Sequence, residues 1–249
     1  MSGQLIVGIH AVRTALKHGA QRVDTLWFDA ARRDRRLREL LDEARAAGLR
    51  PQASDKVTLD RMTAGANHQG VVAQGELPTS LGEAALDALL GALDVPPLLL
   101  VLDGVTDPHN LGACLRSADA AGVEAVVVPK DKSADLNATA RKVACGAAEV
   151  VPFVKVTNIS RTLRALRERG VWLYGAAGEA QQSLYDCDLS TSLALVMGAE
   201  GSGLRRLTRQ QCDVLVRLPM AGSVGSLNVS VAAGICLFEV VRQRLQHGL

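Results

Sequence analysis

The sequence predicts an α/β fold in which a small N-terminal α/β domain precedes a larger α/β domain with a parallel sheet. Short apolar segments of strand length alternate with segments of helical periodicity along most of the chain. A stretch punctuated by proline and glycine, 76–95, is predicted to link residues 1–75 to residues 96–249. The second part opens with an apolar run at 98–102, which is typical of a strand buried on both faces of a parallel sheet.

Each element of the first domain follows from a local pattern. Residues 10–17 have helical periodicity, and 25–28 form a short apolar strand. Apolar residues recur at helical spacing through 37–44 and stop before Gly48, a residue type that often follows a helix. Residues 71–73 are predicted as the last strand, so that the domain has about 75 residues, within the usual range.

The second domain continues the alternation. The linker carries one short predicted helix at 81–93. Strands are then expected at 98–104, 125–128, 171–174, 193–197 and 214–218, and helices at 110–121, 159–169 and 228–245. The last helix is apolar on most of its circumference, so it must be buried within the domain or against a second copy of the chain.

Composition restricts the class of protein. The chain has 249 residues, 48% of them hydrophobic, but no apolar run long enough to span a bilayer and no secretory signal pattern. The five cysteines are scattered without a C-x-x-C pair, and the five histidines are equally dispersed. We therefore expect a soluble, cytoplasmic protein with reduced thiols, no disulfide framework and no metal site.

Positive charge is concentrated near the N-terminus. Residues 1–75 contain 12 Lys/Arg and 8 Asp/Glu, whereas the remainder contains 16 and 18. Four arginines, here called the arginine cluster, stand close together: Arg32, Arg33, Arg35 and Arg36. Charge alone favours a solvated helix face. The alternative is contact with a polyanion, because each phosphate that a cation neutralises releases counterions and adds affinity.

Three polar, glycine-bearing loops follow predicted strands of the second domain, at 103–113, 197–203 and 219–228. Ligands of open parallel sheets bind beyond the carboxyl ends of the strands, where these loops should lie. Neither G-x-x-x-x-G-K-[ST] nor G-x-G-x-x-G is present. The pattern therefore argues against an NTPase, a dinucleotide dehydrogenase and the ordinary Rossmann-type methyltransferase.

The three loops resemble, in order, the three motifs of the SpoU family of RNA ribose 2′-O-methyltransferases, which belongs to the SPOUT superfamily. The matching segments are NLGACLR (110–116), MGAEGSG (197–203) and LPMAGSVGSLNVS (218–230). HQGVVA (68–73) resembles the end of the family's substrate-binding domain. Within the family, CLFEVVRQR (236–244) is most similar to bacterial enzymes that methylate one guanosine of large-subunit (23S) ribosomal RNA.

The resemblance implies a deep trefoil knot in the C-terminal domain, a homodimer, and S-adenosyl-L-methionine (AdoMet) bound by the second and third loops. The expected cofactor contacts are Gly198, Leu218 and Leu227, with Met197 and Ser226 as neighbours. Methyl transfer from a sulfonium needs no metal. The sequence departs from the family pattern at Gly225, where serine is expected.

The resemblance also assigns catalytic roles, with Arg116 as the catalytic arginine held by Asn110 and Ser226, and Glu200 and Asn228 as further site residues. Arg116 acts either as the general base or by orienting the 2′-hydroxyl and stabilising developing alkoxide charge. The second role is favoured, because a guanidinium keeps its proton above about pH 12.

Structural roles are open for the same residues. Asn110 is most simply the N-cap of the helix that follows it, and Glu200 a loop carboxylate that meets backbone N–H groups. Asn228 and Ser230 stand where capping of the last helix is the default. Asp103 and His109 are interpreted as turn residues.

The predicted function is thus AdoMet-dependent 2′-O-methylation of a guanosine ribose in 23S ribosomal RNA, with the arginine cluster as an RNA contact. Two alternatives stay open. One is a ribose methyltransferase acting on tRNA, and the other is a non-catalytic RNA-binding or ribosome-assembly protein that has kept the fold.

Overall fold

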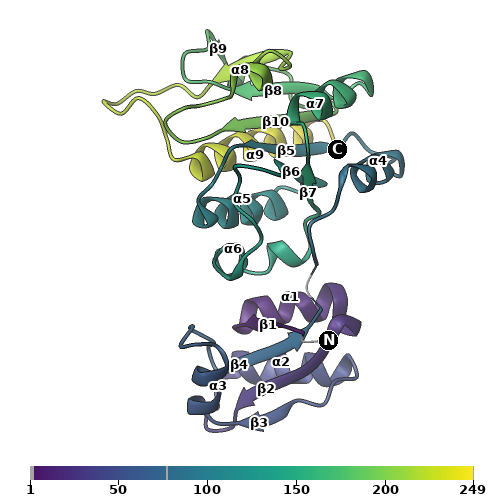
Figure 1. Cartoon of the computed structure of the whole chain (residues 1–249), viewed down its shortest axis with the longest axis vertical. Coiled ribbons are helices and arrows are strands. Elements are labelled where there is room, and N and C mark those ends of the chain that lie inside the picture. Colours follow the sequence, from purple (N-terminus) through teal and green to yellow (C-terminus); the bar gives the residue numbers. More distant parts are fainter. Residues whose placement is uncertain (1–2, 77, 249) are drawn as a thin grey trace. The chain divides into compact units, whose positions relative to one another are not determined.

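The computed structural model describes residues 3–76 and 78–248, which form two compact units (Figure 1). One unit extends to Thr79 and includes the short segment Cys145–Val150; the other comprises Ser80–Ala144 and Val151–Leu249. The linker helix predicted at 81–93 is α4 (Glu83–Gly91), which belongs to the second unit because its Leu86 is buried in that unit's core.

The first unit is a four-stranded sheet in the order β1-β4-β2-β3 with helices packed on it. Its elements are β1 (Gln4–Val7), α1 (Ile9–Gly19), β2 (Val23–Asp29), α2 (Arg35–Ala46), β3 (Gln52–Ser54), α3 (Lys56–Met62) and β4 (Val71–Gly75). β4 is antiparallel to β1 and β2, and β3 is parallel to β2. Strands β1, β2 and β3 therefore all end at the same edge of the unit, where β4 begins.

The core of the first unit lies under α1 and α2. The predicted apolar positions of α2, namely Leu37, Leu40, Leu41 and Ala44, are all buried. Asp34 caps this helix by accepting a hydrogen bond from the Leu37 N–H at 3.1 Å. Three elements of this unit, β1, β3 and α3, were not expected from the sequence, because they are too short to show a period.

The second unit contains seven parallel strands in the order β7-β6-β5-β10-β8-β11-β9, which confirms the predicted parallel sheet. The strands are β5 (Leu98–Asp103), β6 (Ala125–Pro129), β7 (Phe153–Val156), β8 (Trp172–Ala176), β9 (Gln182–Ser183), β10 (Leu193–Gly198) and β11 (Val214–Arg217). Besides α4, the helices are α5 (Pro108–Ala120), α6 (Ala138–Ala144), α7 (Ile159–Glu168), α8 (Arg206–Arg209) and α9 (Val229–Gln246). The short elements β7, β9, α6 and α8 were not predicted.

Helices cover both faces of this sheet (Figure 1). Leu99 and Val101 of β5 share a core with residues of α4 and α7. The alternate residues Leu100 and Leu102 point to the other face, where α5 and α9 pack. All six residues of β5 are buried, as expected for a central parallel strand. Among the described residues, no helix is both long and apolar enough to cross a membrane.

Candidate active site

The second motif loop leaves β10 as a tight hairpin. Ala199 and Gly203 exchange two backbone hydrogen bonds of 2.9 and 3.1 Å. Gly201 and Gly203 have φ angles of 77° and 64°, a left-handed conformation that glycine adopts without strain. A Cβ at Gly198 would lie 2.1 Å from the Gly203 carbonyl carbon and 2.3 Å from the Leu204 nitrogen. Only glycine therefore fits at the end of β10.

A cavity of about 650 Å³ lies beside this hairpin. It is lined by the second loop, by the third loop, and by Ala176 at the end of β8 with residues 177–179 after it. All five residues predicted to contact the cofactor line it: Met197, Gly198, Leu218, Ser226 and Leu227. The volume is within the usual range of small-molecule sites, and the glycine-rich wall lets backbone groups reach a ligand. These residues fit a nucleoside cofactor such as AdoMet.

Three motif residues far apart in the chain form one hydrogen-bonded triangle. Asn110 Nδ2 donates to Glu200 Oε1 at 3.0 Å, and Asn228 Nδ2 donates to the same oxygen at 2.6 Å. Asn228 Nδ2 also lies 2.9 Å from Asn110 Oδ1 and donates to it. This amide–carboxylate triangle ties the first, second and third motif loops together at the cavity wall.

The caps of α5 and α9 contradict the predicted role of Asn110 and confirm that of Asn228. Asn110 is not the N-cap of α5: that helix begins earlier, and Asp107 caps it by accepting from the His109 N–H at 2.9 Å. The Pro108 that follows Asp107 is well suited to the first turn of a helix. Asn228 does cap α9, with its Oδ1 accepting from the N–H groups of Ser230 and Val231. Glu200 bonds the two side-chain amides rather than the backbone N–H groups expected.

Arg116 lies on the same helix as Asn110, at a position on the protein surface. Arg116 is exposed on α5, and Ser226 is exposed in the third loop. Six residues of helix place Arg116 about 120° around the axis from Asn110 and about 9 Å along it. Among the described residues, the cavity lining includes Ser226 but neither Asn110 nor Arg116. That Asn110 and Ser226 hold the arginine stays a prediction.

Asp103, interpreted from the sequence as a turn residue, is instead the last residue of β5 and is fully buried. Its Oδ2 accepts a hydrogen bond of 3.1 Å from the Arg205 backbone N–H. The guanidinium of Arg205 lies 3.3 Å from Oδ1, an ion-pair distance without hydrogen-bond alignment. Asp103 therefore fixes the chain where it leaves the second loop. No local pattern indicates a contact between residues 102 positions apart.

Burial and the Glu200 carboxylate of the triangle both affect the pKa of a nearby thiol, that of Cys114. Burial, together with the Glu200 carboxylate, raises the pKa of the Cys114 thiol to about 12, so this thiol stays protonated. In the described part of the chain, no group of three or more His, Cys, Asp or Glu residues is arranged to hold a metal ion.

The first unit contains the predicted RNA contacts. All four residues of the arginine cluster are exposed, and they lie just before α2 or in its first turn. Arg32 pairs with Asp34, and Arg35 pairs with Glu39. Ion pairs this exposed are weak, so both cations can exchange partners for phosphate.

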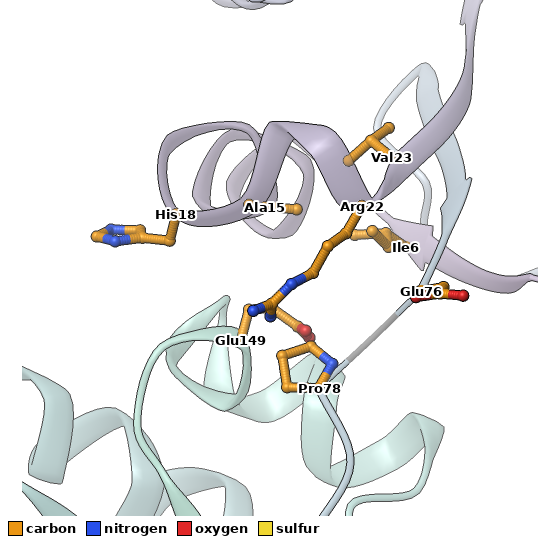
Figure 2. Close-up of a pocket in the computed structure, with 9 residues that line it drawn as sticks. Ile6, Ala15, His18, Arg22, Val23, Glu76, Pro78 and Glu149 are labelled. Carbon is orange, nitrogen blue, oxygen red and sulfur yellow. The ribbon is translucent and has the colours of Figure 1, made fainter. Parts of the chain in front are cut away.

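A small pocket in the first unit, lined among others by Ile6, Ala15, Arg22 and Pro78, has a volume of only about 10 Å³ (Figure 2). That is room for roughly one water molecule, so this pocket does not hold a cofactor.

Comparison with known families matches both parts of the chain. Residues 97–238 match the SpoU rRNA Methylase family, and residues 5–80 match the RNA 2′-O ribose methyltransferase substrate binding family.

Relatives match over nearly the whole length. The 23S rRNA (guanosine-2′-O-)-methyltransferase RlmB of Ralstonia nicotianae is 58% identical over 97% of this chain and 96% of its own. RlmB of Pseudomonas aeruginosa is also 58% identical, over 96% of each chain. The crystal structure of the SpoU methyltransferase AviRb from Streptomyces viridochromogenes in complex with AdoMet has a TM-score of 0.78 at 28% identity, covering 98% of this chain and 92% of that one.

Proposed function

The chain belongs to the SpoU rRNA methylase family, and from this premise we propose that it methylates the 2′-hydroxyl of a guanosine in 23S ribosomal RNA with AdoMet as methyl donor. The observation that carries the proposal is 58% identity to RlmB enzymes across both units, not across the methyltransferase unit alone. By contrast, the structure of the A. aeolicus TrmH/SpoU tRNA modifying enzyme covers 67% of this chain, with a TM-score of 0.58. An enzyme with this substrate works in the cytoplasm.

The cavity between the second and third loops holds the cofactor in this proposal. Gly198 and the hairpin behind it offer backbone N–H and C=O groups, and Leu218 and Leu227 supply apolar contacts. Bound AdoMet supplies an electrophilic methyl group on a positively charged sulfur. The amide–carboxylate triangle holds the walls of the cavity in register before the ligand arrives, which lowers the entropic cost of binding.

Arg116 acts on the ribose in this proposal. Its charge and its planar set of donors suit it to orient the 2′-hydroxyl and to stabilise the negative charge that develops on that oxygen. The position of Arg116 supports a role toward RNA, because it is exposed on the helix that begins with the first motif. Asn110 supports α5 through the triangle rather than by touching the reacting atoms.

The proposal includes the family's trefoil knot. Its support is the path of the chain after β11, which is separated from β5 by β8 and β10 in the sheet. The segment 218–228 leaves β11 and returns to the first motif, where Asn228 bonds Asn110 and Glu200. A knot requires the C-terminal segment to pass through a loop formed by an earlier part of the chain, and this return path is consistent with that. Knots are rare in proteins.

A homodimer is the remaining part of the proposal, and α9 supports it. One side of α9 is buried in its own unit through Ala233, Leu237 and Val240. Another side exposes Val231, Ile235 and Phe238, with Phe238 50% exposed. Their spacing of four and three residues places them in one stripe. An exposed apolar stripe on a helix this apolar fits the self-complementary surface of a twofold dimer.

The test is methyl transfer from methyl-labelled AdoMet to unmodified 23S rRNA, with tRNA as the competing substrate. Alkaline hydrolysis then locates the product, because a methylated 2′-oxygen cannot attack the neighbouring phosphate. We expect one alkali-resistant linkage, 3′ of a guanosine, in 23S rRNA. Labelling of tRNA alone would mean that the substrate is tRNA rather than 23S rRNA. AdoMet binding without labelling of either RNA would support a non-catalytic RNA-binding protein.

A further inference from the structure

The first unit contains a second large pocket, which lies at the edge where three strands end. Its volume is about 360 Å³. The pocket is lined by Asp29 at the end of β2, by Arg32, by Lys56 and Asp60 of α3, and by the loop 65–70 before β4. We call it the His68 pocket. β2 and β3 run parallel to each other, and the segments that follow them contribute Arg32 and Lys56 to this pocket.

A buried histidine makes the wall of this pocket rigid. His68 is 5% exposed, and its Nδ1 accepts a hydrogen bond of 3.0 Å from the Gly70 N–H. Nδ1 is therefore unprotonated, and Nε2 donates to Asp60 Oδ1 at 3.0 Å. Asp60 also accepts from Lys56 Nζ at 2.6 Å, and these two partners lower the pKa of its carboxyl group. The Asp60 carboxylate is thus ionised and already paired with Lys56, in an ion pair exposed enough to exchange partners.

The neighbouring loop residues are held in a conformation that has a cost. Gln69 has a φ of 52°, which is unusual for a residue with a side chain. Its Oε1 accepts from the Ile9 N–H at 3.2 Å at the start of α1, and its Nε2 makes no hydrogen bond to a described residue. Asn67 is exposed and its side chain makes no hydrogen bond to any described residue. Two amides whose donors are unpaired within the described part of the chain therefore line one pocket.

The chemistry of the lining selects the type of ligand. A site for a bare anion would not include two carboxylates, Asp29 and Asp60. A nucleobase presents donors and acceptors together, and amide and carboxylate side chains are the groups that bind its edges. The volume suits one such group, and Arg32 and Lys56 supply positive charge for the attached phosphates. The rest of the arginine cluster follows Arg32 directly in the chain.

We infer that the His68 pocket takes one unstacked nucleotide of the substrate RNA, with the Asn67 and Gln69 amides on the base edge and Lys56 on a flanking phosphate. Sequence-specific RNA recognition uses bases that are splayed out of single-stranded loops, and a pocket of this kind accepts one. The pocket thereby contributes to the choice of RNA site. This inference rests on the proposed function, because it needs an RNA substrate.

The experiment compares three single variants of the full-length protein: Asn67→Ala, Lys56→Ala and the control Arg45→Ala. Arg45 is an exposed arginine in the last turn of α2, paired with the neighbouring Asp42, so its removal matches the loss of charge at Lys56. Steady-state methyl transfer to unmodified 23S rRNA gives KM for RNA, kcat and KM for AdoMet. RNA binding is measured over a range of salt concentrations, and thermal melting checks the fold.

We expect Asn67→Ala to raise KM for RNA by about tenfold with an unchanged salt slope, because an amide that binds a base edge is removed. Lys56→Ala should weaken binding and reduce the slope of log K against log salt by about one, because one phosphate is no longer neutralised. KM for AdoMet should not change in either. If the wild type methylates 23S rRNA and both variants equal Arg45→Ala, the pocket inference is wrong while the proposed function stands. If the wild type methylates no RNA, the proposed function itself is wrong.

Discussion

Replacing Gly198 by alanine tests whether the hairpin beside the cavity is the cofactor wall. The added Cβ would lie 2.1 Å from a backbone carbon of Gly203, whereas carbon atoms pack at about 3.5–4.0 Å. The hairpin must therefore move by more than about 1 Å, and overpacking of this kind costs about 1–3 kcal/mol. If the free protein relieves the overlap by moving residues 203 and 204, AdoMet can bind only when these residues return to their original positions. The free energy of the overlap then reduces the free energy of AdoMet binding. AdoMet binding should then weaken by about 5- to 150-fold.

The assay is isothermal titration of AdoMet, with thermal melting as a check on the fold. Gly225→Ser is the matched control, because Gly225 lines the same cavity and a Cβ there would meet no atom within 4 Å. It also introduces the serine that the resemblance leads us to expect at this position, and its AdoMet affinity should equal that of the wild type. An unchanged AdoMet affinity in Gly198→Ala would refute the assignment of this hairpin as the cofactor wall.

The other assigned groups lead to three further predictions. Arg116→Ala should slow single-turnover methyl transfer by a factor on the order of 10²–10³ without changing AdoMet affinity. Arg116→Lys should stay slow at every pH, because lysine lacks the planar set of donors of a guanidinium. If the activity of the lysine variant recovers as pH rises, residue 116 acts as a general base instead. Substituting the arginine cluster with neutral residues should reduce the slope of log K for RNA against log salt by about one for each phosphate contact that is lost. An unchanged slope would mean that these arginines are solvated and do not contact RNA. If the chain forms the proposed homodimer, Phe238→Asp should convert it to a monomer by light scattering. A dimer mass that the variant leaves unchanged would place the interface elsewhere, and a monomer mass of the wild type would refute the homodimer.

The fold was predictable where a period extends over enough residues. The leucines of α2 and the apolar run 98–102 of β5 lie where the pattern predicts them. Strands such as β3 (three residues) and β7 (four residues) were missed, because so few residues show neither alternation nor a helical repeat. Boundaries were less predictable than elements. The start of α5 was expected at Asn110 because asparagine is a good cap, although Asp107 before proline is an equally good one.

The sequence predicted residues that line the cavity, but not how the motif residues contact one another. Three glycine-bearing loops after strands indicate a ligand site at one edge of a parallel sheet, and the cavity lies there. The partners within the site were not predictable, because they depend on tertiary contacts. Asn110 meets Glu200 across 90 positions, and Asp103 meets Arg205 across 102. A local pattern assigns such residues to the nearest local role, a cap or a turn, and both assignments were wrong.

The His68 pocket did not emerge from the sequence for a similar physical reason. His68 and Gln69 lie in a segment that resembles the end of the family's substrate-binding domain, but no local pattern indicates that they line a pocket. The arginine cluster is the strongest charge signal in the first domain. Yet charge alone positions an RNA without identifying it, because phosphates are the same at every nucleotide. An enzyme that methylates one guanosine among many needs groups that hydrogen-bond to bases. These groups must be neutral, or their charge must be paired with an opposite charge, so that they do not bind every polyanion. The amides of Asn67 and Gln69, beside a carboxylate already paired with His68 and Lys56, meet that requirement. Selectivity for the RNA site should therefore depend on this pocket more than on the arginines, whose removal weakens binding to every RNA alike.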